Sequence, residues 1–431
     1  MKTKLISLIL SVVMIMSAFG MMSVSAETTA ECYWTVDGSE TVNYGTFAQA
    51  VTAANAVSAN GAITITLQND VYNASKTEYC FNIAEGAVAT VTTADGTQKI
   101  GGFSGIVSDG KHNGVSGTHS GTVVLDGITM EHNDTTGKLP PFINSRSKTT
   151  GKMIVNNCTF KSGADVTHDW MYIGLQYSEG YLEMNNCVIE AQGQTACSTW
   201  NEYETAGGVF CFYDSNATII LNGVTVNASN NTAPFVKANS KKTITPNISL
   251  CNVTYDGASG DFNTNNAISM INGASVRTVA GSDGIRFSSN ISKAAIEASA
   301  DSYEMGTSFY TGNAVDASKL IGTLTAKDGI VDNSDGSKRI NAVLSGITDM
   351  AAEYSAQSFI KYTKDSVNVT IYSKFDTQHN TRSMAVVANA ALKDLSDTQT
   401  GIYQYAVTVG GATKYSPYSA PQYAVINNYV N

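Results

Sequence analysis

Charge, proline and basic clusters are scarce in this sequence. Charged residues make up 14% of the 431 residues, six residues are proline, and the formal net charge is -10. Proteins that bind nucleic acid present clustered lysine and arginine to the phosphates, so an acidic chain without such a cluster argues against this class of partner. Hydrophobic residues still make up 43% of the chain, which excludes wholesale disorder. The 37 glycines and the shortage of charge favour strands joined by tight turns.

The cysteines lack the spacing of a zinc or redox site, because no two of them are separated by only two residues. The seven are Cys32, Cys80, Cys158, Cys187, Cys197, Cys211 and Cys251. An odd number leaves at least one thiol unpaired in an exported protein.

The stretch from Asp328 to Gly336 resembles a calcium-binding loop. Ser334 and Gly336 stand where ligands are needed, however, so we expect a turn between strands. We expect neither a metal nor a cofactor.

The first 26 residues have the pattern of an export signal. Lys2 and Lys4 precede an apolar run that ends at Met22, and Val24-Ser25-Ala26 offers small residues for cleavage. A membrane anchor is the alternative, but four serine and glycine residues interrupt the run: Ser7, Ser11, Ser17 and Gly20. No later run is long and apolar enough to span a bilayer. We therefore predict a signal peptide at 1–26 and a mature protein without a membrane span.

Five short segments repeat in the first two thirds of the chain. Each has two apolar residues in alternation, then a polar or glycine pair, then two more apolar residues in alternation. The segments are 122–130, 152–160, 181–189, 218–226 and 247–255, with Leu125, Val155, Met184, Leu221 and Leu250 as equivalent residues. Such alternation is typical of strands, so each segment predicts two short strands that bend at the pair. We expect the five equivalent residues to form one interior column.

The pair at each bend supports this interpretation. The pairs are Asp126-Gly127, Asn156-Asn157, Asn185-Asn186, Asn222-Gly223 and Cys251-Asn252. Asn, Asp and Gly tolerate the left-handed backbone that a sharp bend needs. If the segments stack, the side-chain amides at this position are expected to form a hydrogen-bonded ladder.

A third strand precedes most of these segments, at 142–147, 171–178, 208–215 and 235–240. Three strands in about 30 residues, joined by loops of variable length, are typical of one coil of a parallel β-solenoid. The sequence at this point resembles the right-handed parallel β-helix proteins of the pectin-lyase-like superfamily. In this resemblance, which covers about residues 32–273, the stretch from Tyr44 to Val51 looks like the capping helix and the stretch from Ala62 to Val71 like the first strand.

The cysteines have two interpretations in this repeat. Cys158 and Cys187 share one column with Ile128, Val224 and Val253, which favours buried apolar side chains over a disulfide between coils. Cys197 and Cys211 flank an insertion and are the better pair if any disulfide forms.

The last third of the chain has different motifs. They occur at 273–278, 284–287, 303–307, 354–361 and 382–388, and the chain around them predicts a strand at 367–373 and a helix at 383–395. This order resembles a C-terminal domain found on secreted and surface proteins of Gram-positive anaerobes. Met305 and Gln357 depart from the pattern. The resemblance implies an extracellular setting but does not point to any reaction.

No catalytic residue can be assigned. Enzymes on the β-helix scaffold usually cleave acidic polysaccharides; a lyase needs a basic side chain and a cation near the substrate carboxylate, and a hydrolase needs two or three carboxylates held together. The sequence has neither the closely set Asp pair of polygalacturonases nor the signatures of pectate lyases.

Aromatic and charged residues gather on consecutive coils and predict a glycan-binding groove, because aromatic faces stack on sugar rings. The predicted carbohydrate-binding residues are Arg146, His168, Asp169, Trp170, Tyr172, Tyr177, Trp200 and Asp214. Nearby stand Glu202, Tyr203, Glu204 and Lys237. The alternative is that these aromatics pack the long insertion onto the solenoid wall. The scattered histidines, His112, His119, His132 and His379, are expected to be solvated.

Together these features predict a mainly β protein: a right-handed parallel β-helix with an N-terminal capping helix at 27–273, then a smaller α+β or β-sandwich-like domain at 274–431. We expect a secreted, monomeric protein of the extracellular space or cell surface. Its β-helix is expected to bind a polysaccharide, a cell-surface glycan or a partner protein without catalysis. The alternative is a polysaccharide lyase or glycoside hydrolase that acts on acidic plant or cell-wall polysaccharide.

Overall fold

The computed structural model describes residues 30–430 with internal gaps. The segments outside the description are 1–29, 74–78, 103–105, 109–118, 133–141, 146–150, 163–172, 176–179, 192–207, 213–215, 230–233, 240–242, 258–261, 272–273, 280, 300–301, 327–329, 365 and 431. The predicted signal peptide at 1–26 lies outside the described residues. The protein is mainly β, as predicted, with 49% strand and 14% helix.

The chain divides into two compact units. The first contains residues up to Ile248 together with Val253–Phe262 and Asp365–Val367. The second contains Asn263–Lys364 and Asn368–Asn431, with the short segment Ser249–Asn252. The boundary predicted between residues 273 and 274 stays a prediction.

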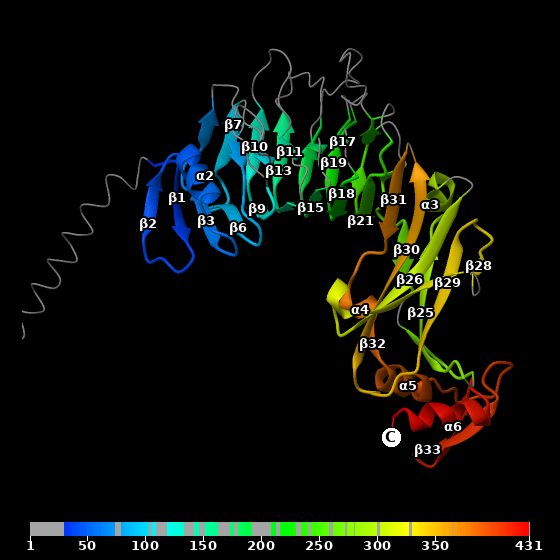
Figure 1. Ribbon diagram of the computed structural model, residues 1–431. Helices are drawn as coiled ribbons and strands as arrows, with labels where there is room; N and C mark the ends of the chain where they lie inside the picture. Colours follow the sequence, from blue (N-terminus) through cyan, green and yellow to red (C-terminus); the bar gives the residue numbers. More distant parts are fainter. Residues whose placement is uncertain are drawn as a thin grey trace, which may run out of the picture. The chain divides into compact units, whose positions relative to one another are not determined.

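The first unit is a β-solenoid built from three parallel sheets (Figure 1). The first sheet contains β3 (Ala62–Leu67), β6 (Val88–Thr93), β9 (Thr122–Asp126), β12 (Lys152–Asn156), β15 (Tyr181–Asn185), β18 (Thr218–Asn222) and β21 (Asn247–Cys251). The second contains β4 (Val71–Asn73), β7 (Lys99–Gly102), β10 (Thr129–His132), β13 (Thr159–Ser162), β16 (Val188–Glu190), β19 (Thr225–Asn227) and β22 (Thr254–Tyr255). The third contains β5 (Tyr79–Phe81), β8 (Ile106–Ser108), β11 (Ile143–Ser145), β14 (Ile173–Leu175), β17 (Phe210–Phe212) and β20 (Val236–Ala238).

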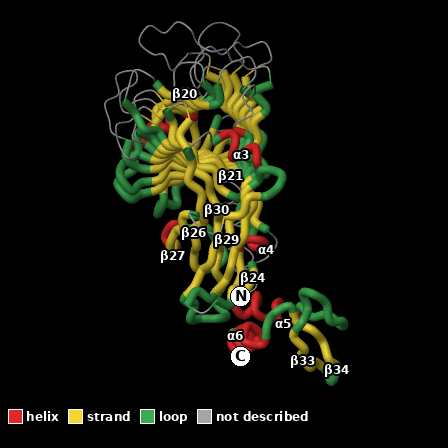
Figure 2. Tube along the Cα trace, turned by 90° about the vertical axis from the view of Figure 1, so that its right-hand side faces the viewer, coloured by secondary structure: helices red, strands yellow, loops and turns green. Residues whose placement is uncertain are grey.

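The predicted interior column is present. Val155 pairs with Leu125 on one side and Met184 on the other, and Met184 pairs in turn with Leu221. These four side chains and Leu250 have no exposed surface. Figure 2 shows strands of successive coils stacked on one another in this unit. Burial of one apolar residue per strand in a common column is what holds the coils in register.

The bends also follow the prediction. The second residue of each pair has a positive φ: 69° at Gly127, 54° at Asn157, 53° at Asn186, 64° at Gly223 and 53° at Asn252. The amide ladder forms between coils: Asn222 Nδ2 donates to Asn185 Oδ1 at 2.9 Å, and Asn185 Nδ2 donates to Asn156 Oδ1 at 3.0 Å. The bends at Asn156-Asn157, Asn185-Asn186 and Asn222-Gly223 thus combine a left-handed backbone with a side-chain bond to a neighbouring coil.

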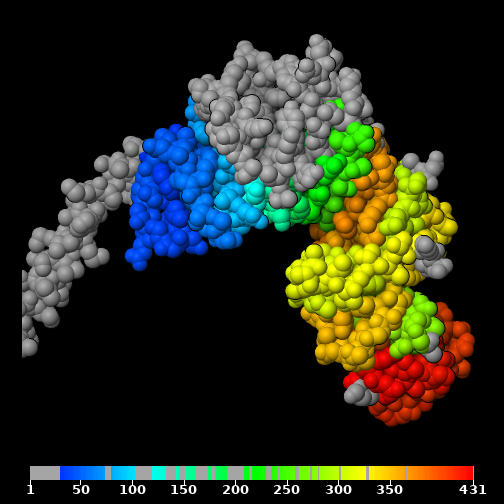
Figure 3. Space-filling view, in the orientation of Figure 1, coloured from blue at the N-terminus to red at the C-terminus, as the bar shows by residue number. Residues whose placement is uncertain are grey.

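Helix α2 (Phe47–Asn55) packs on the first coil. It begins after Thr46, three residues later than predicted, because Tyr44 and Gly45 belong to strand β2 (Val42–Gly45), which pairs with β1 (Cys32–Val36). Thr46 and Gln49 form a capping box, in which the Gln49 amide donates to Thr46 Oγ1 and the Thr46 amide donates to Gln49 Oε1. The helix buries Phe47, whose ring meets Tyr79 of β5 edge to face at 4.6 Å. Figure 3 draws these first elements in blue.

The second unit contains two antiparallel sheets. One has the order β31 (Val367–Tyr372), β30 (Glu353–Lys364), β26 (Tyr303–Thr311), β27 (Leu320–Thr325), and β32 (Thr381–Ser383) pairs with β30. The other has the order β23 (Ile268–Met270), β25 (Gly284–Ile291), β29 (Lys338–Ser345), β28 (Ile330–Asp332), and β24 (Ser275–Arg277) pairs with β25. Phe287 of one sheet meets Phe309 of the other at 6.1 Å between ring centroids, and both are buried. The two sheets thus meet through these buried rings, and the choice between an α+β and a β-sandwich-like domain stays a prediction.

The rest of the second unit consists of short helices and a hairpin. They are α3 (Lys293–Ala298), the 3-10 helix η3 (Ala317–Lys319), α4 (Thr377–Asn380), α5 (Met384–Lys393), α6 (Ala420–Asn428) and the hairpin β33 (Tyr405–Val409) and β34 (Ala412–Ser416). The predicted strand at 367–373 and helix at 383–395 correspond to β31 and α5. The stretch compared with a calcium loop contains the turn between β28 and β29, where Lys338 pairs with Asp332. None of the described helices is long and apolar enough to cross a membrane.

The structure corrects the expectation that the histidines are solvated, at two positions. His119 and His132 were expected to be solvated, but each is only 1% exposed. The His119 ring accepts a hydrogen bond from the Ile83 amide at its Nδ1 (3.3 Å), and the His132 ring stacks on Phe142 at 4.1 Å. His132 is the last residue of β10, and His119 lies shortly before β9. His112 lies outside the described residues.

Candidate functional site

The predicted glycan groove cannot be located in the described part of the structure. All eight residues fall in segments outside it: Arg146, His168, Asp169, Trp170, Tyr172, Tyr177, Trp200 and Asp214. The neighbouring Glu202, Tyr203 and Glu204 do as well. Lys237 is described: it lies half-buried in β20, opposite Cys211 of β17. The groove and the packing alternative both stay predictions.

A different group of side chains is described on the outer face of the first sheet. We call Lys152, Tyr181, Glu183 and Asn185 the Tyr181 cluster. Inward residues such as Met153 and Leu182 are buried, so strand alternation turns the cluster outward. Lys152 and Tyr181 are paired residues of β12 and β15, and Lys152 Nζ lies 5.5 Å from the centre of the Tyr181 ring.

Hydrogen bonds fix the geometry of the Tyr181 cluster. The Tyr181 hydroxyl donates to Glu183 Oε2 at 2.6 Å, and Asn185 Nδ2 donates to Glu183 Oε1 at 2.9 Å. Partial burial, followed by the hydrogen bond and the charge of Glu183, raises the pKa of Tyr181, so the phenol stays protonated and keeps donating. Because Asn185 also belongs to the amide ladder, the cluster continues into neighbouring coils.

The Tyr181 cluster has the chemistry of a carbohydrate surface. It offers a half-exposed aromatic face, a cation, a carboxylate and amides within two adjacent coils. Rings of this type stack on sugars, and the polar groups bond hydroxyls. Sequence reasoning used the repeat for its inward residues and missed these outward ones. The signal was present, since residues 181, 183 and 185 alternate with buried ones.

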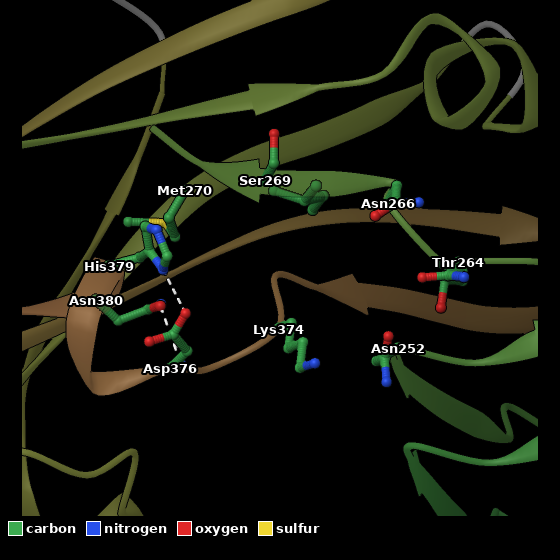
Figure 4. A pocket seen from close by; sticks show the side chains of 11 residues that line it. Asn252, Thr264, Asn266, Ser269, Met270, Lys374, Asp376, His379 and Asn380 are labelled. Atoms are coloured by element: carbon green, nitrogen blue, oxygen red, sulfur yellow. Dashed lines mark hydrogen bonds and ion pairs between the residues drawn. The ribbon is translucent and has the colours of Figure 1, made fainter. Parts of the chain in front are cut away.

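The second unit contains a pocket, which we call the Lys374 pocket (Figure 4). Its volume is about 450 Å³. Its lining residues are Asn252, Thr264, Asn265, Asn266, Ile268, Ser269, Met270, Lys374, Asp376, His379 and Asn380, and all of them belong to the second unit. They come from the bend after β21, from the chain entering and forming β23, and from the segment after β31 together with α4.

One end of the Lys374 pocket is formed by Asp376 and His379, which are bonded to each other. His379 Nδ1 bonds to Asp376 Oδ2, and this bond is the main reason why the pKa of Asp376 is lowered. The backbone amide of Gln378 donates to Asp376 Oδ1 at 2.8 Å. Asn380 is held by the backbone, since its Nδ2 donates to the Ala356 carbonyl at 2.8 Å. The pocket therefore has a preorganised wall.

Four other side chains of the pocket make no hydrogen bond or ion pair with the described residues. Among the described residues, the side chains of Asn252, Asn266, Ser269 and Lys374 have no hydrogen-bonding or ionic partner in the protein. Figure 4 shows Lys374 between the Asp376–His379 pair and the side chains of Asn252 and Thr264. Such groups are available to a ligand. His379, expected to be solvated, is half-buried in this wall.

The described residues contain no group of three or more His, Cys, Asp or Glu side chains placed to hold a metal ion. No match is found among protein-family models, curated proteins or solved structures.

Proposed function

We propose that this protein is exported and that its β-solenoid binds glycans outside the cell without catalysis. The observation that carries the proposal is the Tyr181 cluster, where an aromatic ring, a cation and a carboxylate share the outer face of one sheet. Sugar rings present both C–H faces and hydroxyls, so a surface with these groups side by side suits them. A solenoid places equivalent positions of successive coils at a regular spacing, which suits an extended polymer.

Two further assignments belong to this proposal. The solenoid is a member of the pectin-lyase-like superfamily, and the second unit is related to C-terminal domains of secreted and surface proteins from Gram-positive anaerobes. Three parallel sheets with asparagine-rich bends support the first assignment, and the order of the C-terminal motifs supports the second. Under this proposal the protein acts in an extracellular setting, as a secreted or surface-associated monomer.

The test measures binding of the full mature chain to a panel of acidic and neutral polysaccharides. Tyr181→Ala should weaken binding roughly tenfold or more, by analogy with hot-spot aromatics, and Tyr181→Phe should lose less because the ring remains. Tyr72→Ala is the matched control, since Tyr72 is a 66% exposed tyrosine on the second sheet. Equal loss in both alanine variants, or no loss in either, would contradict the role of the cluster.

The same samples test the predicted groove and the catalytic alternative. Trp170→Ala should weaken binding with little change in thermal midpoint if the groove exists, whereas intact binding with a large fall in midpoint would support packing. Unsaturated or reducing-end products would replace the proposal with the alternative of a polysaccharide lyase or glycoside hydrolase.

A further inference from the structure

The Lys374 pocket is half open, and the side chains of Lys374 and Ser269 in it are exposed. All of its lining residues belong to the second unit. Its volume of about 450 Å³ falls within the range of small-molecule sites, roughly 300 to 1,000 Å³. Ligand binding in this pocket would be independent of the proposed glycan binding by the solenoid.

The lining of the pocket defines the kind of ligand by its hydrogen-bonding groups. Three asparagine amides, Asn252, Asn265 and Asn266, stand with the hydroxyls of Thr264 and Ser269. Amides and hydroxyls both donate and accept, as sugar hydroxyls do. Among these described lining residues there is no Phe, Tyr or Trp, so the pocket lacks a platform for stacking. A compact ligand with many hydroxyls fits this lining better than an apolar one.

The charges of the pocket define the ligand further. The Asp376 carboxylate is already bonded to His379 and to the Gln378 amide. Lys374, by contrast, has no carboxylate within ion-pair distance among the described residues. An ammonium group in a polar pocket forms a charge-assisted hydrogen bond with a carboxylate, which is stronger than a neutral one. The pocket therefore has one unmatched positive charge beside several neutral donors and acceptors.

We propose that the Lys374 pocket binds a sugar acid, that is, a monosaccharide unit with one carboxylate and several hydroxyls. Lys374 binds the carboxylate, and Asn252, Asn266 and Ser269 bind hydroxyls. The Asp376–His379 pair and Asn380 keep the wall in place, because their own hydrogen bonds are satisfied within the protein. The bend at Asn252, with its φ of 53°, directs this residue to the pocket.

The test is calorimetric titration of the full mature chain with D-glucuronate, D-galacturonate, D-glucose and acetate. One or both sugar acids should bind. Glucose and acetate should bind at least about tenfold more weakly, because glucose lacks the carboxylate and acetate lacks the hydroxyls. Lys374→Gln should weaken sugar-acid binding roughly tenfold or more. Ser269→Ala should weaken it by a smaller factor, since a neutral bond is lost.

The matched control is Lys293→Gln, which removes one exposed cation from helix α3 of the same unit. It should bind as the unchanged protein does. The thermal midpoint of every variant is measured alongside, and the exposed positions of Lys374 and Ser269 leave it nearly unchanged. Absence of sugar-acid binding, equal binding of glucose or acetate, or unchanged affinity in Lys374→Gln would each overturn the proposal. If only the Tyr181 variants lose polysaccharide binding, that result concerns the solenoid and not this pocket.

Discussion

At the scale of single residues, His119 shows how a polar ring is accommodated in the solenoid interior. Its ring lies beside Gly151, where an added Cβ would stand 2.1 Å from His119 Cδ2. The glycine thus provides the space for the ring. Burial lowers the pKa of His119 to about 4. A charged imidazole is disfavoured there because its hydration is lost.

This shift predicts a loss of stability in mild acid. The pKa of His119 is depressed in the folded state relative to about 6.5 in the unfolded state, so the unfolded state binds the proton first. The stability that the protein gains from a neutral, buried His119 is complete above pH 6.5 and is lost as the pH falls toward 4. Between pH 7 and pH 5 the free energy of unfolding should fall by about 2 kcal/mol from this residue.

The measurement is urea unfolding of the protein and of His119→Gln at several pH values. The variant is expected to be less stable at pH 7 but to have a flatter dependence on pH, because glutamine does not titrate. The same pH dependence in both proteins would show that His119 is not buried as described.

Cys158 and Cys187 are the second residue-scale case. Both are 1% exposed, and burial raises their pKa values to about 12 and about 11. Reagents attack the thiolate, so neither cysteine should be labelled in the folded protein at neutral pH, and both should react after denaturation. Mass spectrometry of peptides after timed alkylation identifies each site. Rapid labelling of both in the native protein would contradict their inward orientation.

At the scale of elements, the bends are the features on which the solenoid depends. Asn186 has a φ of 53° after β15, a conformation that costs other side chains roughly 1–2 kcal/mol. Asn186→Ala should therefore lower the free energy of unfolding by about 1 kcal/mol, while Asn186→Gly should change it much less. Chemical denaturation of the two variants makes the comparison. Equal losses would mean that the side chain, and not the backbone, matters at this bend.

The same elements show what could be predicted from the sequence. The alternation in 181–189 predicted β15 and β16, and its asparagine pair predicted the bend, because both signals are local. The hairpin of β1 and β2 was missed, since its antiparallel pairing with β3 is set by the end of the solenoid and not by a repeat. Long-range pairing of this kind has no local pattern.

The two candidate sites also differ in whether the sequence alone could have predicted them. The Tyr181 cluster could have been found, because residues 181, 183 and 185 lie at alternate positions of one strand. The Lys374 pocket could not, because Asn252 and Lys374 come from segments more than 100 residues apart. Only the fold brings them together. The eight predicted groove residues lie outside the described structure, so their prediction stands untested.

At the scale of the whole molecule, the two units have separate cores. The solenoid buries the column of Leu125, Val155 and Met184, and the second unit buries Phe287 and Phe309 between its sheets. Damage to the core of one unit should therefore unfold that unit while the other keeps its own cooperative transition.

Val155→Asp tests this expectation. Val155 has no exposed surface and pairs with neighbours in both adjacent coils, so an aspartate would bury an unpaired charge at the centre of the column. Calorimetry of the full mature chain should show loss of the solenoid transition and retention of the transition of the second unit. Ile154→Asp is the control on the same strand: Ile154 is only partly buried and faces outward, so the charge stays hydrated and the transition should survive. A solenoid transition unchanged in Val155→Asp would show that the coils have a different register, and loss of both transitions would show that the second unit does not fold without the first.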